Sequence, residues 1–135
     1  MRYYPSDERY RGVGYTGYNP RVMTLFPTHF SIGPVNIAPA TVLAPMAGVT
    51  DTVFRRFIRN LGGCGLIMTE FTSSHGVSAA IRTSKPNKTL QRYLAFDPDE
   101  HPISAQLFGA DPAVMADAAR VCQDLGFDIL DINFG

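Results

Sequence analysis

The chain has 135 residues, of which 45% are hydrophobic and 18% charged, an ordinary composition for one globular domain with a sizeable core. Its 12 basic and 12 acidic residues cancel, so net charge gives no argument for a nucleic acid or a membrane as partner. No run of about 18 apolar residues predicts a transmembrane helix, and the N-terminal sequence lacks the apolar segment of a secretory signal.

Residues 1–22 differ in composition from the rest of the chain. They hold five of the six tyrosines, together with several arginines and glycines, and show neither a helical nor a strand period. We therefore expect a disordered or weakly ordered leader, followed by a folded part over residues 23–135. Two interpretations of the leader stay open: an RNA-contacting arm built on arginine charge and tyrosine stacking, or a start codon placed upstream of Met23.

From residue 29 onwards the sequence predicts alternating strands and helices. Residues 29–37 indicate a short hairpin that turns at Gly33 and Pro34, and residues 41–44 form a short apolar strand. A helix capped by Thr50 or Asp51 follows. Its apolar residues recur at i, i+3, i+4 and i+7, the spacing of one buried helix face. They are Phe54, Phe57, Ile58 and Leu61, and Gly62 stands at the helix end.

The second half of the chain repeats this alternation. Strands are predicted over residues 64–70, 102–108 and 127–133, with a short helix at 77–81 inside an irregular stretch. A longer helix begins with Asp111 as N-cap and Pro112 as its first residue. Its expected buried stripe is Val114, Ala118, Val121 and Leu125, and Gly126 ends it. Strands that alternate with helices predict a parallel α/β sheet, either an α/β barrel or a doubly wound fold.

Side chains able to carry chemistry follow the predicted strands, and the carboxyl ends of the strands are where α/β barrels hold their sites. These ends carry Pro45-Met46-Ala47-Gly48, Thr69-Glu70, Gln106 and Asn133. An amide both donates and accepts, which suits the edge of a flavin or a pyrimidine. The sequence has no metal-ligand cluster, P-loop or GxGxxG pattern.

Plainer interpretations of these residues stay open beside the chemical ones. Gln106 is as well suited to bonding backbone within the sheet, and Asn133 to forming a turn. Glu70 is equally suited to pairing with a basic neighbour or capping backbone groups. Cys64 and Cys122 form no metal or redox spacing and are expected to be small buried hydrophobes.

Four segments in register resemble the tRNA-dihydrouridine synthases, over about residues 30–135. The segments are Leu43–Asp51 with Phe54-Arg55, Thr69-Glu70-Phe71 with Ser73-Ser74, Gln106–Gly109 with Asp111-Pro112, and Asp131–Gly135. The resemblance implies the N-terminal half, about four β/α units, of an FMN-dependent TIM (β/α)8 barrel. It also implies a cytoplasmic enzyme without a membrane partner, which reduces uridine to dihydrouridine in tRNA with NADPH or NADH as reductant.

By the same resemblance, Pro45, Met46, Ala47 and Gln106 bind FMN, and Asn133 faces the flavin and the target uracil. The family's proton-donating cysteine would follow Gly135, so we expect this chain alone to be truncated before it and inactive. A run of basic residues is expected either to meet phosphates or to form a solvated face: Arg55, Arg56, Arg59, Arg82, Lys85, Lys88 and Arg92. The alternatives are another FMN barrel oxidoreductase, such as an enoate reductase or dihydroorotate dehydrogenase, and a non-catalytic half-barrel module.

Overall fold

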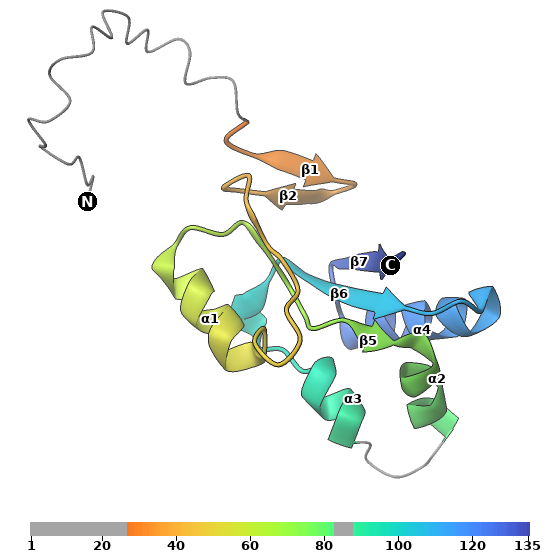
Figure 1. Ribbon diagram of the computed structural model, residues 1–135. Coiled ribbons are helices and arrows are strands. Elements are labelled where there is room, and N and C mark those ends of the chain that lie inside the picture. The colour runs from red at the N-terminus through yellow and green to blue at the C-terminus, as the bar shows by residue number, and fades with distance from the viewer. Residues whose placement is uncertain (1–26, 83–87) are drawn as a thin grey trace, which may run out of the picture.

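The computed structural model describes residues 27–82 and 88–135, and the predicted leader over residues 1–22 lies outside these ranges (Figure 1). Its first element is an antiparallel hairpin of β1 (Phe30–Ile32) and β2 (Val35–Ile37), which confirms the predicted turn at Gly33 and Pro34. Figure 1 shows this hairpin at the opposite end of the described molecule from α2 and α3. Ile37 is fully buried, so the hairpin contributes to the core.

A parallel sheet forms the centre of the molecule, and β6 is its central strand. β4 and β5 pair one after the other with one edge of β6, β7 pairs with its other edge, and β3 pairs with β4. The strands are β3 (Val42–Leu43), β4 (Leu66–Met68), β5 (Thr72–Ser73), β6 (Ile103–Phe108) and β7 (Ile129–Asn133). All of these pairings are parallel, as the alternation of strands and helices predicted.

The single strand predicted over residues 64–70 is wrong in extent, because its ladder stops at Met68 and resumes only as β5. The side chain of Thr69 explains the interruption. Its Oγ1 accepts a hydrogen bond from the backbone N–H of Gln106 at 3.2 Å and donates to the carbonyl of Glu70 at 3.0 Å. A hydroxyl thus replaces a carbonyl in the ladder, and the chain is free to turn the next side chain out of the strand.

Helices connect these strands. The predicted ends of the first and last helix are confirmed, whereas the short helix predicted over residues 77–81 is longer than expected. The helices are α1 (Thr52–Leu61), α2 (Ser74–Arg82), α3 (Lys88–Tyr93), the short 3-10 helix η3 (Pro98–Glu100) and α4 (Pro112–Leu125). Asp51, rather than Thr50, caps α1 by accepting from the N–H of Phe54, and Asp111 caps α4 by accepting from two backbone N–H groups. The sequence did not predict α3, which lies in the stretch that it left irregular.

The helices pack on one face of the sheet. Along β6, the side chains of Ile103, Ala105 and Leu107 are fully buried in the two apolar clusters that include residues of α1, α2 and α4. Because side chains alternate along a strand, Gln106 and Phe108 lie on the opposite face. The helix-covered face therefore holds the helices, while the opposite face carries the polar Gln106 on β6 beside the buried apolar Leu66 and Met68 of β4.

The predicted buried face of α1 is only partly confirmed, because Ile58 packs against an apolar cluster and Phe54 is half-buried. Phe57 is 58% exposed and Leu61 is 67% exposed, whereas Arg55 is buried with 1% exposure. Hydrogen bonds from Arg55 and Arg59, one turn apart, also turn the arginine side of this helix toward the protein.

The expected stripe of α4 is only partly confirmed. Ala118 is fully buried, but Leu125 is 44% exposed and Cys122 takes its place in the core. Cys122 lies one turn after Ala118, so the buried line continues at i+4, and the predicted Val121 packs against the same apolar cluster. Within the two described ranges, no helix is long and apolar enough to cross a membrane.

Candidate functional site

The loop after β3 is a tight turn held by its own atoms. The carbonyl of Met46 accepts from the N–H groups of Val49 at 3.1 Å and Thr50 at 3.0 Å. The buried hydroxyl of Thr50 accepts from the N–H of Met46 at 3.0 Å and donates to its carbonyl at 3.1 Å. Gly48 has a φ of +72°, a backbone conformation that favours glycine. The turn is therefore preformed, with Met46 and Ala47 exposed on it.

Glu70 joins this turn to the end of the next strand. Its side chain is 5% exposed, and its Oε2 accepts a hydrogen bond of 2.5 Å from the backbone N–H of Gly48. Of the interpretations that the sequence left open for Glu70, the capping of backbone groups is confirmed. A buried carboxylate thus fixes the position of the Pro45–Ala47 segment relative to β4.

A buried ion pair stabilises the end of this turn. Arg55 and Glu100 are 1% and 0% exposed, and their Nε and Oε2 atoms lie 2.6 Å apart. Arg55 also donates from Nη1 to the carbonyl of Thr50 at 2.8 Å, while Glu100 accepts from the hydroxyl of Thr52 at 2.6 Å. Each charge is therefore partnered and hydrogen-bonded, as burial of an ion requires.

The suggestion that the arginines of α1 meet phosphates is not supported. Arg55 belongs to the ion pair above, and Arg59 donates to four backbone carbonyls, among them those of Cys64 and Pro102. The exposed Arg56 pairs with Asp97 and Asp99, and its pKa is raised chiefly by the hydrogen bond to Asp99. The three side chains organise the protein itself.

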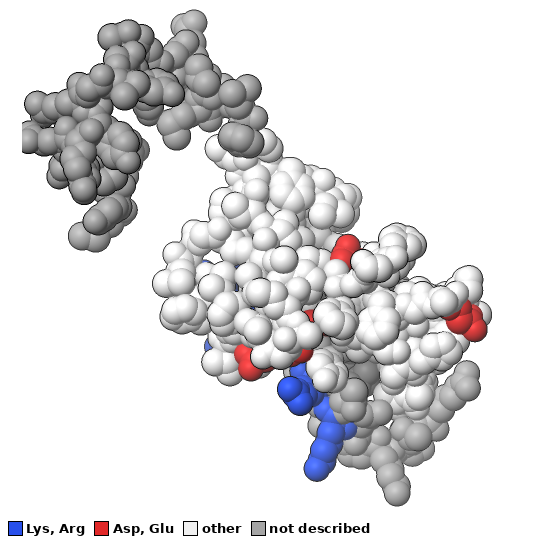
Figure 2. Space-filling view, viewed as in Figure 1, with Lys and Arg blue, Asp and Glu red and all other residues white. Residues whose placement is uncertain are grey.

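Two other basic residues of the predicted run remain exposed. Lys88 and Arg92 lie on α3, where Figure 2 shows blue side chains grouped together. The guanidinium of Arg92 lies 5.4 Å from the centre of the Tyr93 ring. Lys85, from the same predicted run, lies outside the described residues.

A row of polar side chains runs across β6 and β7 on the face opposite the helices. Gln106 and Asp131 are paired in register, and Asn133 lies two residues further along β7 on the same face. Gln106 Nε2 donates to Asp131 Oδ2 at 2.5 Å, and Asn133 Nδ2 donates to Gln106 Oε1 at 3.4 Å. Asn133 Oδ1 in turn accepts from the backbone N–H of Gly135 at 2.9 Å.

Sequence reasoning missed Asp131, although strand alternation could have found it. Asp131 and Asn133 are two residues apart in a predicted strand, so they share a face of the sheet. The interpretation that Gln106 bonds backbone did not take this face into account. The side chain of Gln106 bonds two side chains instead. Asn133 does form the turn-like contact to Gly135 that its residue type suggested.

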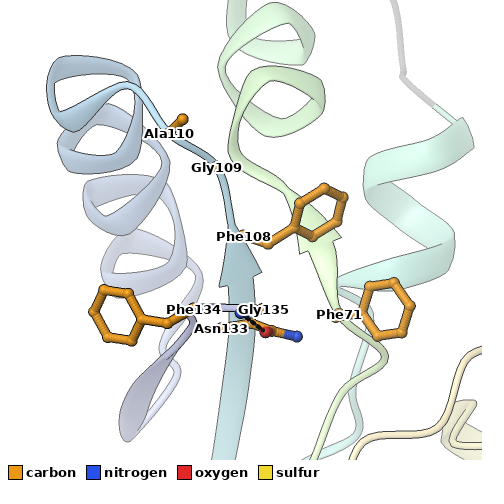
Figure 3. Close-up of a pocket in the computed structure, with 7 residues that line it drawn as sticks. All are labelled: Phe71, Phe108, Gly109, Ala110, Asn133, Phe134 and Gly135. Atoms are coloured by element: carbon orange, nitrogen blue, oxygen red, sulfur yellow. Dashed lines mark hydrogen bonds between the residues drawn. The ribbon is translucent and has the colours of Figure 1, made fainter.

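Two hollows open at the carboxyl ends of the strands, and Phe71 and Phe108 line both. The larger, of about 490 Å³, also contains Asn133, and the smaller, of about 260 Å³, also contains Ala47 and Glu70. The rings of Phe71 and Phe108 meet edge to face at 5.7 Å. Figure 3 shows Asn133 pointing toward Phe71, whereas Phe134 points to the other side. Ala47 and Asn133 thus lie at hollows that share one aromatic pair.

The two cysteines do not line these hollows. Cys64 and Cys122 are both buried and in the reduced form, within the apolar clusters on the helix-covered face, as the sequence predicted. Burial raises the pKa of Cys122 to about 11. His101 is partnered, since its Nδ1 lies 2.6 Å from Asp128 Oδ2, near the start of β7.

Comparison with known proteins identifies the family. The model of the dihydrouridine synthase family matches residues 42–135. The tRNA-dihydrouridine synthase B of Pseudomonas aeruginosa is 40% identical over 104 residues, which are 77% of this chain and 29% of that protein. The protein of the same name from Xanthomonas axonopodis pv. citri is 45% identical over 105 residues, again 77% of this chain and 29% of the relative.

A probable tRNA-dihydrouridine synthase of Rickettsia bellii is 36% identical over 104 residues, 77% of this chain and 30% of the relative. The chain therefore spans about 30% of the length of the curated relatives that it matches. The family match also sets aside the alternative of a different FMN barrel, such as an enoate reductase. Since the family model covers most of the chain, including the first turn, Gln106 and Asn133, the chain belongs to the dihydrouridine synthase family.

Proposed function

We propose that this chain supplies the first part of the FMN site of a tRNA-dihydrouridine synthase, the enzyme that reduces uridine to dihydrouridine in tRNA. In this proposal the sheet is the N-terminal half of a TIM barrel. Two features support the half barrel: successive strands pair in parallel, and the helices cover one face of the sheet. Action on tRNA would place the protein in the cytoplasm.

One observation carries the proposal more than the others. The two amides of Gln106 and Asn133 lie in hydrogen-bond contact on the face opposite the helices, at the carboxyl ends of two parallel strands. A doubly wound sheet would need helices on that face. In a barrel the same face points inward and its carboxyl end is the active-site rim.

The residues present fit a flavin. The Pro45–Ala47 turn offers exposed backbone and small side chains, against which a flat ring could lie, and it is already rigid through Thr50 and Glu70. Gln106 and Asn133 each offer a donor and an acceptor, which match a ring edge with alternating C=O and N–H groups. FMN, reduced by NADPH or NADH, would supply the hydride. The protein would bind and orient the ring.

The chain by itself is proposed to be inactive. Reduction of a uracil needs a proton donor beside the ring, and neither Cys64 nor Cys122 can serve. Both thiols are buried in the apolar clusters on the helix-covered face, away from the rim where a ring would lie. A donor has to come from elsewhere in the complete enzyme.

Substrate tRNA would reach the rim from solvent. A uracil inside a stem or a folded loop must leave its stack before a ring can meet it face to face. The exposed cations Lys88 and Arg92 on α3 would then lie available for backbone phosphates. The opposing interpretation, that they form a solvated face, is decided by whether their removal changes the salt dependence of tRNA binding.

The first experiment expresses the 135-residue chain in a strain that lacks its own dihydrouridine synthases. Dihydrouridine in bulk tRNA is measured by mass spectrometry, with the Pseudomonas aeruginosa relative as positive control. We expect no modified base from the chain alone. Appearance of dihydrouridine would refute the proposed inactivity.

A chimera tests the positive half of the proposal. The 104-residue segment of the Pseudomonas aeruginosa relative that matches this chain is replaced by the corresponding residues of this chain. We expect flavin absorbance in the purified chimera and dihydrouridine in tRNA. Gln106→Leu should lower the modification at least about tenfold, the effect of losing about 1.4 kcal/mol of binding. Asp124→Asn, an exposed change on α4, is the matched control. A folded chimera that binds no flavin would contradict the assignment.

A further inference from the structure

Asp131 is the charged member of the polar row on β6 and β7. It is half-buried on the face opposite the helices, directly beside Gln106 in the register of the sheet. The contact between Gln106 Nε2 and Asp131 Oδ2 is 2.5 Å, short for a hydrogen bond between an amide and a carboxylate. A half-buried carboxylate in a binding rim needs an explanation.

The carboxylate determines how the neighbouring amide is oriented. An ionised carboxylate only accepts hydrogen bonds, so the NH₂ group of Gln106 must face Asp131. The carbonyl Oε1 of Gln106 then points the other way, where the NH₂ group of Asn133 donates to it at 3.4 Å. Asn133 Oδ1 is left for the N–H of Gly135 at 2.9 Å. All donors of this chain of bonds therefore point in one direction, toward Asp131.

We propose that Asp131 is a positioning residue that fixes the orientation of both rim amides. With Asp131 in place, Gln106 and Asn133 each keep one N–H and one carbonyl lone pair free, and each presents them in a defined order. A ring edge with alternating C=O and N–H groups is recognised only by amides whose NH₂ group and carbonyl oxygen are held in fixed positions. The part of the inference that concerns the flavin rests on the proposed function, whereas the part that concerns the orientation of the two amides does not.

A purely structural role for Asp131 makes a different prediction. If the carboxylate merely satisfied one half-buried donor, Asp131→Asn would affect Gln106 alone, because an asparagine at this position can still accept. If it sets the direction, Asn133 must respond too, since it has no direct bond to Asp131 among those described. The response of the second amide therefore separates the two roles.

The test is NMR of the ¹⁵N-labelled 135-residue chain, which reports the side-chain amide signals of Gln106 and Asn133. We expect that Asp131→Asn shifts both pairs of signals and weakens the nuclear Overhauser contact between the two side chains. The double variant Asp131→Asn with Gln106→Glu should restore the ordered Asn133 signals, because the new carboxylate at position 106 again only accepts. Asp124→Asn, exposed on α4, removes the same charge elsewhere.

The backbone amide signals of the same spectra report whether each variant is folded. The proposal is overturned if a folded Asp131→Asn variant leaves the Asn133 signals unchanged, or if the folded double variant does not restore them. Should Asp131→Asn unfold, the double variant alone still decides, since a structural role predicts no recovery of the Asn133 signals from moving the charge to position 106.

Titration with FMN, followed by quenching of flavin fluorescence in the chimera described above, tests the link to the ligand. We expect Asp131→Asn to weaken FMN binding about tenfold, which corresponds to about 1.4 kcal/mol, and Asp124→Asn to leave it unchanged. If the chimera with the native Asp131 binds no FMN, the proposed function fails while the NMR result still decides the role of Asp131. Equal affinities of the native chimera and Asp131→Asn would overturn the positioning role toward the flavin.

Discussion

At the scale of single residues, the close packing between the residue that follows β6 and the start of α2 requires a glycine at position 109. A Cβ atom at Gly109 would lie 2.1 Å from Ser74 Oγ and 3.3 Å from Ser74 Cβ. Ser74 is fully buried at the start of α2, and its hydroxyl has no hydrogen-bond partner among the described residues. The glycine thus leaves space for a buried hydroxyl that makes no hydrogen bond to the described residues.

This arrangement makes a prediction with a built-in rescue. Gly109→Ala should lower the free energy of unfolding by about 1 kcal/mol, the lower end of overpacking costs, because the hydroxyl of Ser74 can rotate. Ser74→Ala should be neutral or stabilising, since it removes a buried unpaired polar group. In the double variant most of the loss should disappear. Urea unfolding of the four proteins measures the coupling, and additive effects would contradict the contact.

The buried thiol of Cys122 predicts a dependence of stability on pH. Its pKa is raised from 9.0 to about 11 by burial, so the folded state favours the protonated thiol. Stability from this group is fully present below about pH 9. It is lost as the pH rises toward 11, because only the unfolded thiol ionises readily there. The free energy of unfolding, measured with urea, should therefore decrease less between pH 8 and pH 10.5 for Cys122→Ala than for the wild-type chain. Equal decreases would contradict the shift.

At the scale of elements, α1 is held by charge in addition to the apolar packing that its sequence suggested. Arg55→Met leaves Glu100 buried without its partner and should cost about 3–5 kcal/mol. Combining it with Glu100→Leu should recover most of the loss, because an apolar pair of similar volume removes both unpaired charges.

Arg56→Met is the matched control on the same helix. Its ion pairs with Asp97 and Asp99 are roughly half exposed, so the loss should stay below about 1 kcal/mol. Thermal and urea unfolding compare the variants. A double variant that is no more stable than Arg55→Met would show that the ion pair has a role beyond neutralising its two members.

The elements also show how far the sequence could go. The alternation of strands and helices, their parallel pairing and the cap Asp111 were predictable, and Asp51 was one of two candidate caps, because turn chemistry and alternation are local signals. The burial of Arg55 was not, since its partner lies 45 residues away at Glu100. The break between β4 and β5 was missed for the same reason, because the hydroxyl of Thr69 accepts a hydrogen bond from Gln106, a residue of another strand.

The candidate site follows the same rule. Single residues at strand ends were readable, because the carboxyl ends of parallel strands converge wherever the chain runs between them. The bonds among Gln106, Asp131 and Asn133 depend on the register between β6 and β7, which no local pattern specifies. Their roles toward a flavin stay predictions that the chimera and the spectra test.

At the scale of the whole molecule, apolar side chains and a strand edge remain uncovered. Phe134 is 95% exposed and Ile132 is 40% exposed, and β7 pairs with β6 alone among the described strands. An open edge of this kind is a template for pairing with another chain. The isolated chain is therefore expected to associate with itself, the behaviour also required of the half-barrel module that the sequence left as an alternative.

A charge on the edge strand should reduce this association. Ile132→Lys places a lysine on β7, the device by which natural edge strands avoid pairing. Val53→Lys on α1 is the control, because Val53 is 74% exposed but lies on a helix. Sedimentation velocity over a range of concentrations should show fewer large species for Ile132→Lys only. If both lysines act equally, general surface hydrophobicity and not the strand edge drives association.

The alternation of side chains along β6 also has a meaning for how such a protein can change. Ile103, Ala105 and Leu107 hold the helices, while Gln106 and its neighbours on β7 serve the opposite face. We therefore expect mutations in one set to change the other set little, although the two sets alternate residue by residue along the strand. A lineage could thus revise what its rim recognises while inheriting the same scaffold intact.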